Sequence, residues 1–211
     1  MTFIPDTWPP ADGSDQPTRT APVFPLRDVF LFPGQLLPLH IFEPRYRQMI
    51  EDSLDAAGRI VMAPILDGQP ETPEGPGLAP IAGIGEIAQH HRLPDGRFLV
   101  WLLGLGRVRI QPIESDRLYR KVRYDLAEEV GPTRTEIDEL HAPLHRAVLD
   151  RVGGETKLPQ AVTTAQLADI LGQCLHLPST LMAQIYGETR VTHRARMVLD
   201  AHDRFPGRRR T

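Results

Sequence analysis

The sequence has little of several features that would place it in a specialised class. It contains one cysteine, Cys174, so an intrachain disulfide is excluded and a reducing compartment is favoured. No apolar run approaches the ~18 residues that a membrane-spanning helix needs. The first residues lack the basic and apolar segments of a secretion signal. We therefore expect a cytoplasmic protein.

The chain also has no excess of positive charge, because its formal net charge is −3 at pH 7, and it therefore has no overall field that attracts nucleic acid. Apolar residues make up 41% of the chain and charged residues 24%, as in ordinary globular proteins. A chain of 211 residues can hold one large domain or two small ones with a real core. The 21 prolines predict many breaks and long loops, among them a surface loop at 67–80.

The motifs of common catalytic machinery are missing. No Gly-x4-Gly-Lys-Ser/Thr phosphate-binding loop occurs. The serines and lysines lie in neither a nucleophile elbow nor a Ser–Lys motif; they are Ser14, Ser53, Ser115, Ser179, Lys121 and Lys157. We expect a protein that is not an enzyme, with no catalytic residue and no cofactor.

Histidine and cysteine spacings do not indicate a metal site. His141 and His145 have the i, i+4 spacing of a zinc-binding helix, but no Glu accompanies them and Pro143 lies between them. Cys174 and His176 would point apart on a helix, and the thiol lies on an apolar stripe that predicts burial. We expect no bound metal.

Residues 22–50 carry the densest structural signals. Two apolar runs, Val23 to Phe32 and Leu36 to Phe42, predict strands on either side of a tight turn at Pro33-Gly34. Proline presets φ, and glycine supplies the positive φ that a type II turn needs. A helix is expected to begin at Glu43-Pro44, because proline is favoured at the first helical position and a carboxylate suits that end of the helix dipole. It is expected to run to about Ala57, because Gly58 suits the position after a helix.

Further strand patterns continue to about residue 130. Apolar or alternating runs lie at 60–66, 81–91, 98–103, 107–111 and 119–126. Leu93–Arg97 contains Asp-Gly and predicts a hairpin turn, and Gly104-Leu-Gly106 predicts a bulge or bend.

The pattern becomes helical after Gly131-Pro132. Four helices are expected to open near Thr133 or Thr135, Thr164, Pro178 and Thr192. Pro143 should kink or break the first helix. The predicted organisation is an arm at 1–20, a β domain at 21–131, a helical subdomain at 132–205 and a basic tail at 206–211.

The stretch FPLRDVFLFPGQLLPLHIFEPRYRQMI, residues 24–50, resembles the opening motif of the Lon substrate-binding domain. This is the N-terminal domain of Lon-type ATP-dependent proteases, and it also occurs as a free-standing bacterial protein. Further similarity lies at Gly83–Ile87, Pro94–Arg97 and Gly104–Arg107. The resemblance implies an α+β fold, with a PUA-like β pseudo-barrel that contains one helix, followed by a helical bundle. The periodicities alone support β followed by α.

The same resemblance implies a polypeptide-recognition module, a substrate-binding or adaptor domain without ATPase or peptidase parts. The candidate polypeptide-binding residues are Phe32, His40, Phe42, Tyr46 and Arg47, around the expected strand-to-helix corner. The expected partners are unfolded or extended polypeptide and a Lon-type protease or another protein. We expect a monomer or a weak homodimer that does not bind membranes.

Three alternatives stay open. The corner can be purely structural, with Glu43 capping the helix. A PUA-like domain can bind RNA through a basic strip of Arg107, Arg109, Arg120, Lys121 and Arg123, although nearby acids favour cross-strand ion pairs. A barrel of this kind can also hold a small molecule at its mouth.

Overall fold

The computed structural model describes residues 19–65, 75–153, 158, 159 and 161–205. The chain divides into two compact units, Met1–Ala127 and Glu128–Thr211, and each is described by itself. The predicted tail at 206–211, nearly all of the arm at 1–20 and most of the predicted loop at 67–80 lie outside the described residues.

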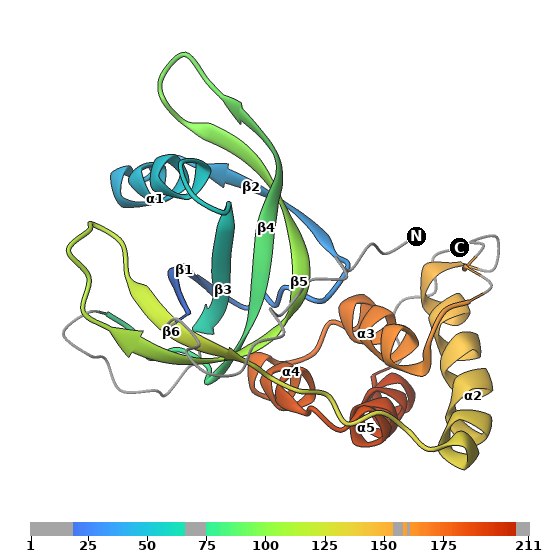
Figure 1. Ribbon diagram of the computed structural model, residues 1–211. Helices are drawn as coiled ribbons and strands as arrows, with labels where there is room; N and C mark the ends of the chain where they lie inside the picture. Colours follow the sequence, from blue (N-terminus) through green and yellow to red (C-terminus); the bar gives the residue numbers. More distant parts are fainter. Residues whose placement is uncertain (1–18, 66–74, 154–157, 160, 206–211) are drawn as a thin grey trace. The chain divides into compact units, whose positions relative to one another are not determined.

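A six-stranded sheet and one helix form the described part of the first unit (Figure 1). The elements are β1 Thr20–Arg27, β2 Leu36–Ile41, α1 Pro44–Leu54, β3 Arg59–Ile65, β4 Ile81–Arg92, β5 Phe98–Ile113 and β6 Lys121–Leu126. The strand order is β2-β5-β4-β3-β1-β6, and β6 also pairs with β5. This second pairing closes five strands into a ring and leaves β2 beside β5, which is the geometry of a β pseudo-barrel.

The length of β5 makes this closure possible. Its first part, up to Leu103, pairs with β2, and its last part, from Val108, pairs with β6. The register with β4 shifts opposite Leu105, between Gly104 and Gly106, as a β-bulge does. The predicted bulge is confirmed, and the two strands expected on either side of it are one bent strand.

The first strand differs from the prediction. It ends at Arg27 rather than Phe32, and it pairs in parallel with β3 and antiparallel with β6, not with β2. The turn at Pro33-Gly34 is present, with φ 77° at Gly34. The apolar run before the turn reflects burial instead of a strand, because Leu31 is fully buried in the core.

Helix α1 packs against the sheet in one core cluster, and a separate cluster is shared by all five strands of the ring. The helix begins at Pro44 as expected and ends at Leu54, three residues before the expected Ala57. Met49 and Ile50 are fully buried. They belong to a core cluster with Phe24, Ile41, Ile60, Met62, Phe98, Val100 and Leu102, which come from four strands.

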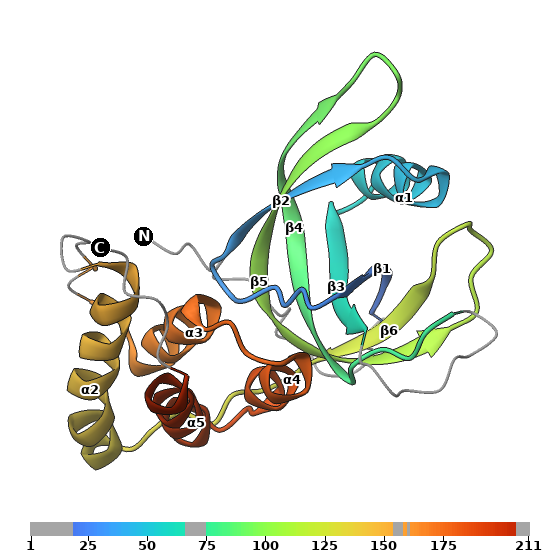
Figure 2. The same cartoon turned by 180° about the vertical axis from the view of Figure 1, so that it is seen from behind.

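Helices make up the described part of the second unit: α2 Arg134–Val152, α3 Thr164–Cys174, α4 Ser179–Gly187 and α5 Val191–Arg204 (Figure 2). Thr133 caps α2 in a capping box with Glu136, as its sequence position predicts. The cap of α3 is Thr163 rather than Thr164. Helix α2 continues through Pro143, so the predicted break does not occur.

A buried arginine organises the second unit. Arg194 is fully buried, and its guanidinium lies 2.7 Å from the Glu129 carboxylate and 3.0 Å from that of Asp169. It also donates to the carbonyl oxygen of Glu188 at 2.7 Å. A buried guanidinium needs such partners, because an unpaired charge in a core costs several kcal/mol.

The predicted α+β class, β elements followed by helices, is confirmed. None of the helices in the described ranges has the length and apolar character needed to cross a membrane.

Candidate functional site

Two of the five predicted site residues are buried. Phe32 is 3% exposed, and the Arg107 guanidinium carbon lies 5.6 Å from its ring centroid. Tyr46 packs its ring 4.4 Å from that of Phe24, and burial raises the pKa of its hydroxyl. Both side chains pack inside the first unit and present almost no surface to a ligand.

Arg47 lies against the turn that joins β4 to β5. Gly96 in that turn has φ 80°, and a Cβ built there would lie 2.9 Å from the Arg47 guanidinium carbon. The side chain therefore occupies the space over the turn. This contact assigns Arg47 a supporting role for the hairpin.

The charged side chains at the corner between β2 and α1 pair with each other. Glu43 is the N-cap residue of α1, but its side chain makes no capping hydrogen bond. Its carboxylate instead accepts from Arg45, at 3.0 Å from Nε and 2.7 Å from Nη2. The structural alternative holds for the position of Glu43 and not for its expected capping bond.

The remaining two predicted residues, His40 and Phe42, are exposed, with ring centroids 5.8 Å apart. They extend onto a larger surface of β2 and β5. Because strand side chains alternate, burial of Phe98, Val100 and Leu102 directs the intervening residues of β5 outward. In register, Leu36 pairs with Leu103, Pro38 with Trp101 and His40 with Leu99. We call these six residues together with Phe42 the outer strip.

The outer strip is mostly apolar and partly open to solvent. Phe42 is 60% exposed, Leu36 53% and Leu103 37%, and Leu36 and Leu103 are direct cross-strand neighbours. On the far side of β5, each outward residue has a polar neighbour on β4. Leu103 pairs with Glu86, Trp101 with Gln89 and Leu99 with His91, and these β4 residues form a polar border. A contiguous apolar surface with a polar rim is typical of a protein-binding site.

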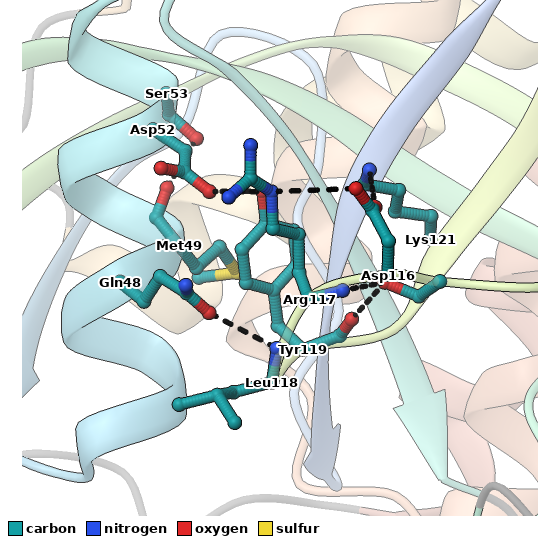
Figure 3. Close-up of polar contacts among 10 residues, drawn as sticks. Gln48, Met49, Asp52, Ser53, Asp116, Arg117, Leu118, Tyr119 and Lys121 are labelled. Atoms are coloured by element: carbon teal, nitrogen blue, oxygen red, sulfur yellow. Dashed lines mark hydrogen bonds and ion pairs between the residues drawn. The ribbon is translucent and has the colours of Figure 1, made fainter.

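A further exposed leucine, Leu118, lies on the loop between β5 and β6, far from β2 in sequence and held against α1 (Figure 3). The Tyr119 hydroxyl donates to the Asp52 carboxylate at 2.8 Å, and Gln48 accepts from the Leu118 amide at 3.0 Å. Burial, reinforced by the bond to Asp52, raises the pKa of Tyr119. Leu118 itself is 67% exposed. These contacts hold the loop against α1, and the raised pKa keeps the Tyr119 hydroxyl protonated.

A small cavity of about 210 Å³ lies beside this loop, lined by residues 112–121. Its cations already have partners: Lys121 Nζ lies 2.7 Å from Asp116, and Arg120 donates to the Pro76 carbonyl at 2.8 Å. Arg107, from the predicted basic strip, is buried. RNA and small-molecule binding stay predictions.

Within the described ranges, no three His, Cys, Asp or Glu side chains are grouped so that they could hold a metal. His141 Nε2 lies 3.0 Å from the Val162 carbonyl oxygen, which gives it a structural contact. Burial raises the pKa of the Cys174 thiol and so disfavours the reactive thiolate.

Residues 20–202 match the family described as the ATP-dependent protease La (LON) substrate-binding domain. The chain belongs to this family, as its 24–50 stretch predicts. It is similar to Lon protease 2 of Sorangium cellulosum, at 28% identity over 72% of this chain and 18% of that protein. It is also similar to the Lon protease of Elusimicrobium minutum, at 29% identity over 55% of this chain and 15% of that protein.

The chain thus spans less than a fifth of the length of these relatives. Among solved structures, the N-terminal domain of Mycobacterium avium complex Lon protease superposes with a TM-score of 0.68, at 20% identity, over 88% of this chain and 98% of that chain. The Lon N-terminal domain protein from Xanthomonas campestris gives 0.65, at 22% identity, over 86% and 98%. These likenesses establish the fold.

Proposed function

We propose that this chain is a non-catalytic polypeptide-recognition module that captures apolar segments of client proteins on the outer strip. The observation that carries the proposal is the row of exposed apolar side chains from Leu36 and Leu103 to Phe42. The family's description as a substrate-binding domain, and the Lon proteases among its relatives, agree with a protein ligand. Binding by burial of apolar side chains requires no cofactor.

The proposal keeps His40 and Phe42 from the predicted site and replaces the buried residues by Leu36, Leu103 and their neighbours. Burying a Leu or Phe side chain completely stabilises by roughly 1.5–3 kcal/mol. Leu36 and Phe42 are already about half covered, at 53% and 60% exposed. Each therefore has about 1 kcal/mol left to contribute to client binding.

A client held here would need a separate motor and peptidase for its degradation. The sequence contains no phosphate-binding loop and no Ser–Lys motif. We therefore expect no ATP hydrolysis or peptide cleavage by the chain alone, and we propose a Lon-type protease or another protein as a second partner. A cytoplasmic location is part of this proposal, because the single cysteine suits a reducing compartment.

The test is the binding of a reduced, alkylated and fluorescently labelled protein that cannot refold, followed by anisotropy. Replacing Leu36→Ser and Phe42→Ser together should weaken binding by about 30-fold, since about 2 kcal/mol of apolar burial is lost. The matched control is Leu118→Ser, which removes a leucine that is 67% exposed on the β5–β6 loop. Equal affinity of the double variant and the control would refute the proposal.

RNA binding is tested in the same assay with labelled single-stranded RNA. Affinity that falls steeply with salt would indicate phosphate contacts and favour the alternative function. Apolar capture predicts little change in affinity between low and moderate salt.

A further inference from the structure

Among the residues that the structure describes, β2 is an edge strand of the sheet, and its outer edge is poorly suited to adding a strand. Backbone groups of alternate residues point toward the neighbouring strand. The Gly104 N–H donates to the Gln35 carbonyl oxygen at 2.8 Å, so the backbone groups of Gln35 point toward β5. Because the direction alternates along a strand, the backbone groups of Leu37, Leu39 and Ile41 also point toward β5. The backbone groups of Leu36, Pro38 and His40 therefore point to the opposite edge.

Pro38 occupies the middle of that edge. It has no N–H to donate, and its ring lies where an added strand would need to approach. Proline at an edge is one way that sheets discourage pairing with another chain. The main chain of an extended client consequently finds no continuous hydrogen-bonding ladder on β2.

An extended client laid across the strip would instead leave its backbone N–H and C=O groups at the sides of the chain, without partners on the protein. Only every second side chain of such a client faces the strip, and each contributes only the ~1 kcal/mol expected per apolar contact. A helix satisfies its backbone hydrogen bonds within itself. We infer that the occupant of the outer strip is an amphipathic α-helix of the client, and this inference rests on the proposed function.

The dimensions of the strip fit one short helix. The six residues of β2, from Leu36 to Ile41, span about 20 Å at roughly 3.4 Å per residue. A helix of about 13 residues has the same length at 1.5 Å per residue. Apolar side chains at i, i+3, i+4 and i+7 would line such a helix along the strip.

The charges at the rim point to a helix without a strong net charge. Glu86, which continues the row of Leu36 and Leu103, lies 3.8 Å from Arg59. At the other end, Glu43 pairs with Arg45 at 2.7 Å. Because both of these carboxylates have a counter-charge beside them, the rim matches a client helix whose polar flanks carry both signs equally.

A helix this short is marginally stable in water, so the client segment would become ordered as it binds. A client that is already helical should therefore bind more tightly. The test uses three peptides of about 14 residues with leucines at helical spacing and balanced Glu and Lys. One carries a lactam bridge on its polar face, one is linear, and one has proline at a central polar position.

Anisotropy with the full chain should give the order bridged, linear, proline, with about 10-fold or more between the first and the last. The double replacement Leu36→Ser and Phe42→Ser should weaken the bridged peptide, and Leu118→Ser should not. If the proline peptide binds as well as the bridged one, the helix inference fails while polypeptide capture stands. If unfolded protein binds but no peptide does, the helix inference likewise fails and polypeptide capture stands.

If neither peptides nor unfolded protein bind, the proposed function itself fails. The strip could also be covered by a second copy of the chain, and light scattering coupled to gel filtration tests this. A dimer that the double replacement converts to a monomer would overturn the helix inference.

Discussion

Replacing Gly104→Ala should destabilise the first unit strongly, because the Pro33-Gly34 turn packs directly on β5 at this residue. A Cβ at Gly104 would overlap the carbonyl oxygen of Phe32, lie 3.0 Å from its carbonyl carbon and lie 3.2 Å from Leu31 Cγ. The obstacle is backbone on one side and a fully buried side chain on the other. Neither can rotate away.

Relief of the overlap requires the turn and β5 to separate. That movement strains two hydrogen bonds, Gly34 N to Gly104 O and Gly104 N to Gln35 O, both 2.8 Å long. A net loss of about 0.5–1.5 kcal/mol for each bond adds to about 1–3 kcal/mol for overpacking a core. We expect the free energy of unfolding to fall by about 3 kcal/mol.

The assay is urea unfolding followed by tryptophan fluorescence. All proteins carry Trp8→Phe, so that Trp101, on β5, reports the first unit alone. With a slope of about 1.5 kcal/mol per M, the midpoint should fall by about 2 M.

The control is Gly106→Ala, two residues further along the same bulge. A Cβ there meets no atom within 4 Å, and the residue does not have a positive φ. We expect this variant to unfold within about 0.5 kcal/mol of the parent, as surface replacements usually do. Equal midpoints for the two alanine variants would refute the close packing described here.

Three further predictions concern polar groups. Tyr119→Phe removes the bond to Asp52 and should cost about 1–3 kcal/mol near pH 7 in thermal or urea unfolding. The folded state raises the pKa of Tyr119, so the stability that its hydroxyl adds is fully present below about pH 10 and declines above it. Above about pH 10 the free energy of unfolding of the parent should therefore fall, relative to that of the variant, by up to about 1.4 kcal/mol per pH unit. Stabilities of parent and variant that change with pH in parallel would contradict this. Hydrogen bonds from Arg190 lower the pKa of Glu188 to about 2, so the stability that Glu188 adds is present above about pH 4.5 and is lost as the pH falls toward 2; parent and Glu188→Gln should converge at acid pH and differ at neutral pH. Arg194→Met should cost about 3–5 kcal/mol in the unfolding of the second unit, since the buried Asp169 carboxylate loses its counter-charge, and a loss below about 1 kcal/mol would contradict that role.

Local signals in the sequence were sufficient wherever one residue determines the local geometry. Thr133 predicts its own cap because its hydroxyl and the Glu136 side chain act within one turn. Pro44 predicts the start of α1, and Gly34 predicts a turn, for the same reason. These signals depend on a few covalent neighbours, and no distant partner alters them.

Strand pairing could not be predicted in this way. The run before the turn is as apolar as a strand, but Leu31 is apolar because it packs against Gly85 and Gly104 of other strands. The parallel pairing of β1 with β3 joins segments that no local pattern connects. Pro143 shows the converse, because α2 continues through a residue whose intrinsic preference disfavours a helix interior.

The sequence predicted only part of the candidate site, namely His40 and Phe42, because β2 is apolar on both faces. In Leu-Leu-Pro-Leu-His-Ile the alternation of inward and outward side chains leaves no trace in hydrophobicity. Only the register with β5 shows that Leu37 and Ile41 face the core and that Leu36 and His40 face outward. A signal was available in β5, where strict alternation from Phe98 implies an outward Leu103, but its neighbour across the sheet was unknown.

The two faces of β2 separate the residues that hold the fold together from those that we propose bind a client. Its inward residues and the Pro33-Gly34 turn are fixed by contacts with β5 and α1, so their replacement should lower stability before it affects binding. Its outward residues make few contacts that the fold needs, and Leu36 remains 53% exposed. Because Leu36, Leu103 and Phe42 form a contiguous exposed apolar patch and not a single exposed side chain, we propose that a partner covers them.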